Sequence, residues 1–301
     1  MKLATSTGDF GAHTSSQKEC ITYIRQAGFR YADYSFIIDY KHRSGVYAPG
    51  FIEYAKDLKA YADSIGIKFV QAHAPMGKPL SEGDEQKAFI QDTIRTIEAC
   101  ALLGIDRIVV HSGYKMDISK EECFDLNKEF YLILLKEAEK YGVNILVENF
   151  NKMHVDGMYW IDNAKDLRAL IDYVDHPLFH AVWDTGHANM QAMPQDEALK
   201  ILAEHVYALH VQDNLETGDH HLPPFFGTMN LDSLLTGLTD IGYKGYFTFE
   251  CGNFFLANAH KKPYEKSNRL VKPPLALRLK GEEFLYETGK WMLSSYGAFE
   301  E

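Results

Sequence analysis

Short apolar runs alternate with amphipathic stretches eight times along the 301-residue chain, and this alternation constrains the fold more than any other feature. The runs predict strands at residues 2–7, 31–36, 67–72, 107–110, 144–147, 180–183, 206–209 and 245–249. The stretches between them predict helices at residues 15–27, 49–65, 82–103, 120–141, 163–174, 194–205 and 231–241. Strict alternation of this kind implies a parallel sheet. Eight units without a leftover strand favour an α/β fold closed into a (β/α)8 TIM barrel over an open doubly wound sheet.

The ends of the predicted helices support this division. Five of them reach a glycine, where a left-handed residue commonly ends a helix: Gly28, Gly66, Gly104, Gly142 and Gly242. A further helix is predicted over 275–294, after the last strand. The length fits one barrel, which typically takes about 250 residues, so we expect residues 1–301 to form a single domain with an additional C-terminal helix. No GxGxxG motif follows the first strand, which disfavours a dinucleotide-binding fold.

Charge and cysteine usage narrow the class of protein. The net charge of −11 argues against broad contact with nucleic-acid phosphates, so no nucleic-acid partner is expected. No apolar run approaches the roughly 18 residues of a membrane span, and no membrane association is expected. The four cysteines form no close pair and no secretory leader is visible, so we predict a cytoplasmic protein.

The segment HAVWDTGHAN, residues 180–189, carries the strongest single signal for chemistry. It delivers Asp184 at the end of an apolar strand, and Gly186 turns the chain so that His187 follows closely. A carboxylate and an imidazole at such a position suit a divalent metal. The alternative is structural, with Asp184 capping the next helix and His187 packing nearby.

The same pattern recurs at the other predicted strand ends, where a barrel carries its reactive groups. These positions and the loop after the seventh strand hold His73, His111, Glu148, Asp184, His187, His210, Asp219, His221 and Glu250. Each alone could be a hydrogen-bonded structural residue. Gathered at one barrel mouth, their charges are costly to bury unless a cation compensates them, so we predict a metal site.

These motifs identify a family resemblance. The strand-end set, the WDTGH run and the D-x-H-x-x-P-x-x-G pattern of residues 219–227 resemble the xylose isomerase-like TIM-barrel proteins, which include sugar and sugar phosphate isomerases and epimerases and share their fold with endonuclease IV. The resemblance implies metal ligands at Glu148, Asp184, His210 and Glu250. It also implies that Glu148 and Glu250 act as opposed bases and that His187 holds a hydroxyl or the developing oxyanion. It leaves His73, His111, Asp219 and His221 for substrate binding or a second metal shell.

An oxygen-rich ligand set suits Mn²⁺, Mg²⁺ or Co²⁺, and zinc is also compatible. Isomerising or epimerising a sugar requires removing a proton alpha to a carbonyl. A metal stabilises the resulting enediolate, and a carboxylate on each face can take and return the proton. The resemblance therefore implies a metal-dependent isomerase or epimerase whose partner is a small-molecule carbohydrate. The sequence leaves open which sugar it is, whether it is phosphorylated, and whether the protein is a homo-oligomer.

Two departures restrict the prediction to this broad class. The 3-epimerases of the family carry a second Glu six positions after the strand-five ligand, where this chain has His154, and an Arg after the strand-seven His, which residues 211–216 lack. One alternative is a metal-dependent dehydratase or lyase on a keto-sugar or cyclitol. Another is an endonuclease IV-like AP endonuclease, because all nine strand-end and loop residues fit that family's three-zinc pattern.

Aromatic residues and two lysines in or beside the predicted loops permit two interpretations each. Tyr34, Phe36, Tyr40, Tyr47, Phe225, Phe226, Phe254 and Phe255 could pack on one another or form an apolar wall against a sugar. Lys78 and Lys115 could reach a phosphate or lie on the solvated surface.

Overall fold

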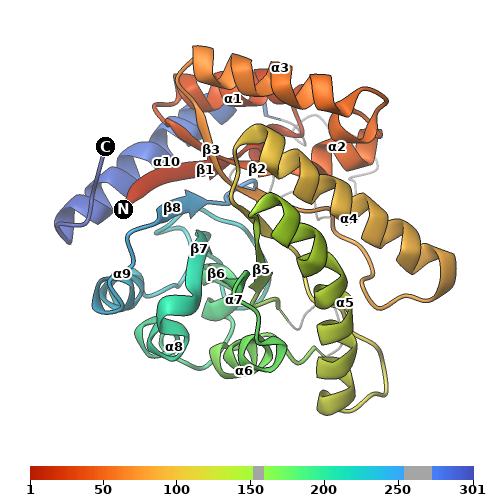
Figure 1. Cartoon of the computed structure of the whole chain (residues 1–301). Helices are drawn as coiled ribbons and strands as arrows, with labels where there is room; N and C mark the ends of the chain where they lie inside the picture. The colour runs from red at the N-terminus through yellow and green to blue at the C-terminus, as the bar shows by residue number, and fades with distance from the viewer. Residues whose placement is uncertain (152–158, 254–272) are drawn as a thin grey trace, which may run out of the picture.

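The computed structural model describes residues 1–151, 159–253 and 273–301 and forms a barrel of eight parallel strands surrounded by helices (Figure 1). The strands are β1 (Lys2–Ser6), β2 (Tyr31–Ser35), β3 (Lys68–His73), β4 (Arg107–Val109), β5 (Asn144–Glu148), β6 (Phe179–Asp184), β7 (Val206–His210) and β8 (Tyr246–Phe249). Their spatial order is β7-β6-β5-β4-β3-β2-β1-β8, so every strand lies beside its neighbour in sequence. The predicted barrel is therefore confirmed.

The barrel closes between β7 and β8 through fewer paired residues than its other strand pairs. A single parallel bridge joins Val211 to Phe249. The Val211 amide donates to the carbonyl oxygen of Thr248 at 2.7 Å, and the Glu250 amide donates to that of Val211 at 3.0 Å. This seam lies at the carboxyl ends of the two strands, beside His210 and Glu250.

Helices follow the strands along the chain, and most of them cover the outside of the barrel (Figure 1). They are α1 (Gln17–Gln26), α2 (Phe36–His42), α3 (Phe51–Ser64), α4 (Gly83–Leu103), α5 (Lys120–Tyr141), α6 (Ala164–Val174), α7 (Thr185–Asn189), α8 (Gln195–Leu202), α9 (Leu231–Asp240) and α10 (Leu275–Ser295). Gly104 and Gly142 end α4 and α5 with φ of 74° and 67°, as the sequence predicts. No helix in the described part of the chain is long and apolar enough to cross a membrane.

The strand residues divide between two apolar clusters. Val109, Leu146, Val182 and Ala208 come from four adjacent strands and form a small cluster, separate from the main core, which contains their sequence neighbours. Successive strand residues point to opposite faces, so this small cluster marks the lumen face of the barrel. The polar residues two positions further along share that face, which brings them to the carboxyl-terminal mouth.

The structure corrects the sequence analysis in two places. Residue 36 does not extend β2, because Phe36 begins α2, which the sequence analysis treated as a loop. Here the Tyr34 hydroxyl donates to buried Asp39 at 2.8 Å, so the segment folds back on the strand. A short helix, α7, also follows β6 directly.

The positions of the described aromatic residues support the first interpretation, in which these side chains pack within the protein. Tyr34 and Phe36 are buried in the core, and Tyr40 packs against Tyr47. Phe225 and Phe226 lie against Trp291 and Phe284 of α10. Phe254 and Phe255 lie outside the described residues.

Candidate metal and substrate site

All nine predicted site residues meet at the carboxyl-terminal mouth of the barrel. His73, Glu148, Asp184 and His210 are the last residues of β3, β5, β6 and β7, and Glu250 directly follows β8. The others are His111, His187, Asp219 and His221, from the segments after β4, β6 and β7. Strand alternation aims the strand-end side chains into the lumen, which explains why residues so far apart in sequence converge.

Four of these residues form what we call the ligand cluster: Glu148, Asp184, His210 and Glu250. One side-chain donor atom from each lies within 4.8 Å of the others. His210 Nδ1 is 3.3 Å from Glu148 Oε1 and 3.7 Å from Glu250 Oε2. Asp184 Oδ2 is buried and has no hydrogen-bond partner among the residues that the structure describes. A buried carboxylate oxygen without a partner is costly unless a cation satisfies it, so the cluster fits a divalent metal.

Asp184 serves as helix cap and candidate ligand at once, so the two interpretations of this motif are compatible. Its Oδ1 accepts the backbone N–H of His187 at 2.7 Å, which begins α7 and leaves Oδ2 directed elsewhere. Gly186 is required here because a Cβ at this position would lie 2.1 Å from the Gln212 side chain. Gln212 Nε2 in turn donates to Asp184 Oδ1 at 3.2 Å.

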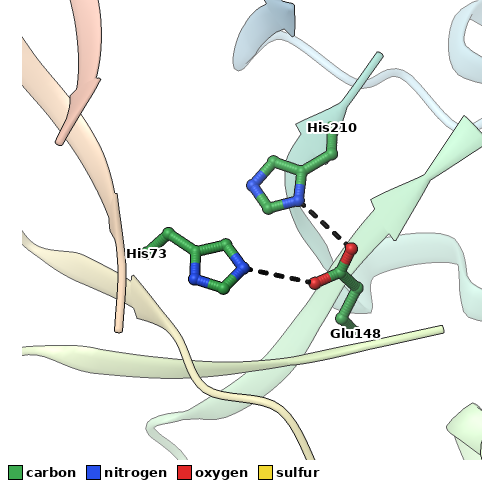
Figure 2. Close-up of side chains that lie close together, drawn as sticks. All are labelled: His73, Glu148 and His210. Atoms are coloured by element: carbon green, nitrogen blue, oxygen red, sulfur yellow. Dashed lines mark hydrogen bonds and ion pairs between the residues drawn. The ribbon is translucent and has the colours of Figure 1, made fainter. Parts of the chain in front are cut away.

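Glu148 lies at the centre of the site and contacts a histidine through each oxygen. Its Oε2 is 2.7 Å from His111 Nε2 and 3.8 Å from His73 Nε2, and its Oε1 faces His210. Figure 2 shows His73 and His210 approaching the carboxylate from two sides. The Glu148 side chain is only 2% exposed. Its orientation is therefore determined by its neighbours.

A second cluster consists of His187, Asp219 and His221, whose donor atoms also lie within 4.8 Å of one another. Asp219 bridges the two histidines, with Oδ2 at 3.4 Å from His187 Nε2 and Oδ1 at 3.2 Å from His221 Nε2. Asn149 accepts from His187 Nδ1 through its carbonyl oxygen at 2.9 Å, which fixes the ring. His221 has a left-handed backbone, with φ of 48°.

Burial and mutual charge shift the pKa values of these groups. Burial, reinforced by Glu148 and Glu250, raises the pKa of Asp184 to about 7 against the opposing effect of His187. Burial also opposes ionisation of Glu148, but His111 and His210 outweigh it and hold its pKa well below the usual range. Burial lowers the pKa of His210, yet Glu250 and Glu148 raise it well above normal overall. The cluster thus draws positive charge, which a metal would supply in place of protons.

A layer beneath the ligand cluster was missed by the sequence analysis. Asp33 of β2 lies with Oδ2 3.3 Å from His210 Nε2, on the side of the ring opposite the cluster. Gln71 donates to Asp33 at 3.1 Å and accepts from the Thr248 hydroxyl at 3.0 Å. A carboxylate behind a ligating histidine orients the ring and raises its basicity. The available signal was an acidic residue inside a predicted strand.

Helix α10 supports Glu250, the remaining residue of the ligand cluster, from outside the barrel. Buried Arg278 donates to Asp9 Oδ2 at 3.0 Å and to the carbonyl oxygen of Cys251 at 3.2 Å. The Cys251 amide donates to the same Asp9 oxygen at 3.2 Å. Both polar backbone groups of Cys251 are therefore held directly after Glu250, so the helix restrains the position of that glutamate.

The sequence profile of the xylose isomerase-like TIM-barrel family matches residues 21–272. The chain belongs to this family. An uncharacterised protein of Methanocaldococcus jannaschii is 27% identical over 244 residues, which cover 78% of this chain and 81% of that protein. Fructoselysine 3-epimerase of Escherichia coli O157:H7 is 26% identical over 123 residues, 41% of this chain and 44% of the relative. The resemblance stated from the motifs is thus confirmed.

Several solved structures share the fold over nearly the whole chain. A protein named IolI with a bound zinc atom has a TM-score of 0.78 at 17% identity and covers all of both chains. A D-tagatose 3-epimerase-like protein has a TM-score of 0.73 at 22% identity, covering 98% of this chain and all of that one. A 3-keto-D-glucoside 4-epimerase from E. coli has a TM-score of 0.71 at 18% identity, covering 95% and 99%. At these identities the likeness shows the fold alone.

The remaining observations from the sequence concern His154 and the two loop lysines. His154 lies outside the described residues. Lys78 and Lys115 lie near the mouth, where Lys78 pairs with Glu85 at 3.6 Å and Lys115 with Glu82 at 2.7 Å. These pairings favour the surface interpretation of the two lysines over a phosphate site.

Proposed function

We propose that this protein is a divalent-metal-dependent isomerase or epimerase that removes a proton next to the carbonyl of a carbohydrate. The observation that carries the proposal is the ligand cluster, in which three carboxylates and one imidazole from β5 to β8 converge at the mouth. Family membership and an epimerase among the curated relatives support the same class. The cytoplasmic location and the absence of a nucleic-acid partner stay predictions.

Glu148, Asp184, His210 and Glu250 would hold the ion, with Mn²⁺, Mg²⁺ or Co²⁺ favoured by the oxygen-rich set. Zinc is also compatible, and IolI carries it. A divalent ion bound there would supply the electrophile that polarises a substrate carbonyl.

The two glutamates differ in ways that suit different parts of a proton transfer. The Glu250 side chain is 22% exposed, and its Oε2 lies 3.7 Å from both His210 and His221. Glu148 is almost fully buried and contacts histidines through both oxygens. In this proposal Glu148, held ionised by its histidines, removes the proton on one face, and Glu250, protonated beforehand from solvent, gives a proton to the other face. His187 would hold a hydroxyl or the developing oxyanion.

Solvent exchange tests the proposal directly. The Mn²⁺-loaded protein is incubated in deuterated water with ketoses, keto-glycosides and their phosphates, and we expect deuterium at the carbon alpha to the carbonyl of a true substrate. Metal-stripped protein is the control. A dehydratase or lyase would use the same proton abstraction but release water or a cleaved product, which mass spectrometry of the products distinguishes. Absence of exchange across the panel would contradict the proposal.

A second candidate is metal-assisted cleavage of DNA at abasic sites. The observation that favours it is the second cluster of His187, Asp219 and His221, because phosphodiester hydrolysis commonly uses more than one metal. The net charge of −11 disfavours it. Three ions per chain together with incision of an abasic duplex would establish this candidate, whereas one ion and no incision would support the isomerase.

A further inference from the structure

A cavity of about 500 Å³ opens beside the ligand cluster, between the loops that follow β3 and β4. His111, which contacts Glu148 at 2.7 Å, forms its inner wall together with Phe150. Met76, Tyr114 and Met116 line its outer part and are 51%, 44% and 52% exposed. Large apolar side chains that are exposed together around a cavity commonly mark a binding site.

Aromatic rings connect the cluster to the protein surface along this cavity. The ring of Phe150 lies 4.8 Å from that of His111 and 5.6 Å from that of Tyr159. Tyr159 lies 6.3 Å from Tyr114 in an edge-to-face arrangement. The Tyr159 hydroxyl is engaged by Ser112 and its side chain is buried, so Tyr159 supports Phe150 and Tyr114, whose partly exposed rings can contact a ligand. The wall is therefore suited to a flat apolar group that extends outward from the mouth.

The charges around the cavity favour a neutral group. No carboxylate occurs among its described lining residues. The lining cations, Lys78 and Lys115, are paired with Glu85 and Glu82 on the surface. A charged substituent would compete with these pairs, whereas an apolar one would gain the burial of its surface.

The cavity is fixed by the fold. Buried Asn127 of α5 accepts the Gly113 amide at 2.7 Å and donates to the Gly113 carbonyl at 2.9 Å, which holds the loop carrying Tyr114 and Met116. A Cβ on Gly113 would lie 2.5 Å from the Leu80 side chain, so the two loops pack in close contact. A preformed site gains affinity because little ordering remains to be done on binding.

We propose that this cavity receives an aromatic substituent on the sugar, so that the substrate is an aryl-substituted carbohydrate rather than a free monosaccharide. Its volume falls in the range of roughly 300–1,000 Å³ that encloses drug-sized ligands, and it lies outside the ligand cluster, where the reacting part of the sugar would bind. This inference rests on the proposed function for the position of the sugar. It makes the loops after β3 and β4 the determinants of specificity.

Matched methyl and phenyl glycosides of each keto-hexose in the panel test it. Their affinity for the Mn²⁺-loaded protein is measured by titration calorimetry. We expect the phenyl member to bind roughly 10- to 100-fold more tightly, from the burial of one ring. The double variant Tyr114→Ala/Met116→Ala should lose most of this ratio, because both side chains line the cavity. Since both side chains are exposed, their truncation should leave the fold intact. Trp291→Ala, which removes an exposed aromatic on α10, is the matched control and should keep the ratio.

The outcomes separate this inference from the proposed function. Equal binding of the two glycosides, weak binding of both, or a phenyl preference that survives the double variant would overturn the cavity assignment. Deuterium exchange on methyl glycosides without a phenyl preference would do so while leaving the isomerase proposal intact. A phenyl preference that the double variant removes, without exchange on any glycoside, would support the cavity and contradict the isomerase.

Discussion

The barrel mouth has two unlike halves that meet at Phe150, whose ring lies 5.2 Å from His187 and 5.6 Å from Tyr159. In the polar half, towards β5 to β8, charged side chains are buried and contact one another. In the cavity half, between the loops after β3 and β4, apolar side chains are partly exposed. Buried charges are costly without a compensating partner, whereas apolar walls gain free energy when a ligand covers them. The polar half is thus suited to the reaction and the cavity half to the choice of substrate.

The largest expected effect is the loss of bound metal when Asp184 of the polar half is replaced. Asp184→Ala removes the buried oxygen that lacks a partner in the described part of the chain. We therefore expect the protein to fall from roughly one bound ion per chain to near none, with loss of exchange activity. Inductively coupled plasma mass spectrometry measures the metal. Asp63→Ala, on the surface of α3, is the matched control. Full occupancy in the Asp184 variant would show that this residue is no ligand.

The next effect separates the two glutamates within the polar half. Glu250→Gln and Glu148→Gln keep an oxygen donor, so some metal should remain, but each loses a base, which typically lowers the rate by about 10² to 10⁴. The variant that retains the abstracting base should still exchange deuterium while failing to complete the isomerisation. Proton NMR follows exchange and product together. If both variants turn over like the wild type, the glutamates are ligands only.

A smaller effect is expected where the two halves meet. Phe150→Leu keeps apolar volume but removes the ring contacts with His111 and His187. Aromatic pairs contribute about 0.5–1.5 kcal/mol beyond their buried area, so kcat/KM should fall roughly 3- to 10-fold, since 1.4 kcal/mol is tenfold. Phe225→Leu, in an exposed contact with Trp291, is the control. An unchanged kcat/KM would show that the halves act independently.

The smallest effect concerns the pH dependence of stability in the polar half. Burial lowers the pKa of His221, but Asp219 outweighs it and the pKa rises from 6.5 to about 10. Because the pKa of His221 is higher in the folded state, protonation of His221 stabilises the folded protein fully below pH 6.5. This contribution to the free energy of unfolding is lost as the pH rises to about 10. The Tm of metal-free protein should therefore fall by a few degrees over that interval, since about 1 kcal/mol shifts Tm by roughly 2–4 °C.

Differential scanning fluorimetry in EDTA measures this slope. His221→Ala should flatten it, whereas His42→Ala, at an exposed position, should not. Bound metal should weaken the slope, because it displaces protons from the cluster. A His221→Ala protein that keeps the wild-type slope would assign the effect to other groups.

The polar half was predictable from the sequence because strands have a period of two. Once the strands were assigned, their terminal residues had to face one mouth, and Glu148, Asp184 and His210 follow from that alone. Asp33 was missed because it lies inside a strand, where its position beneath His210 depends on how β2 and β7 oppose each other across the lumen. That a metal binds the cluster, and that the substrate is a sugar, stay predictions.

The cavity half was not predictable, because loops carry no comparable period. Its shape depends on Asn127, a residue of α5 fourteen positions after Gly113, which holds that glycine through two hydrogen bonds. The ring stack of Phe150 and Tyr159 likewise depends on tertiary packing. From the sequence, Phe225 and Phe226 could also form a sugar-binding wall, but in the structure they lie against α10.

The seam between β7 and β8 has a consequence for how the barrel opens. Backbone pairing there consists of the Val211 bridge alone, and His210 and Glu250 lie on its two sides. Cooperative opening begins where few hydrogen bonds must break, so hydrogen exchange should be fastest at the Val211 and Glu250 amides among the barrel strands. An ion shared by His210 and Glu250 would join the two edges as a cross-link does. Closure of the barrel and binding of the metal would then be coupled, so that each stabilises the other.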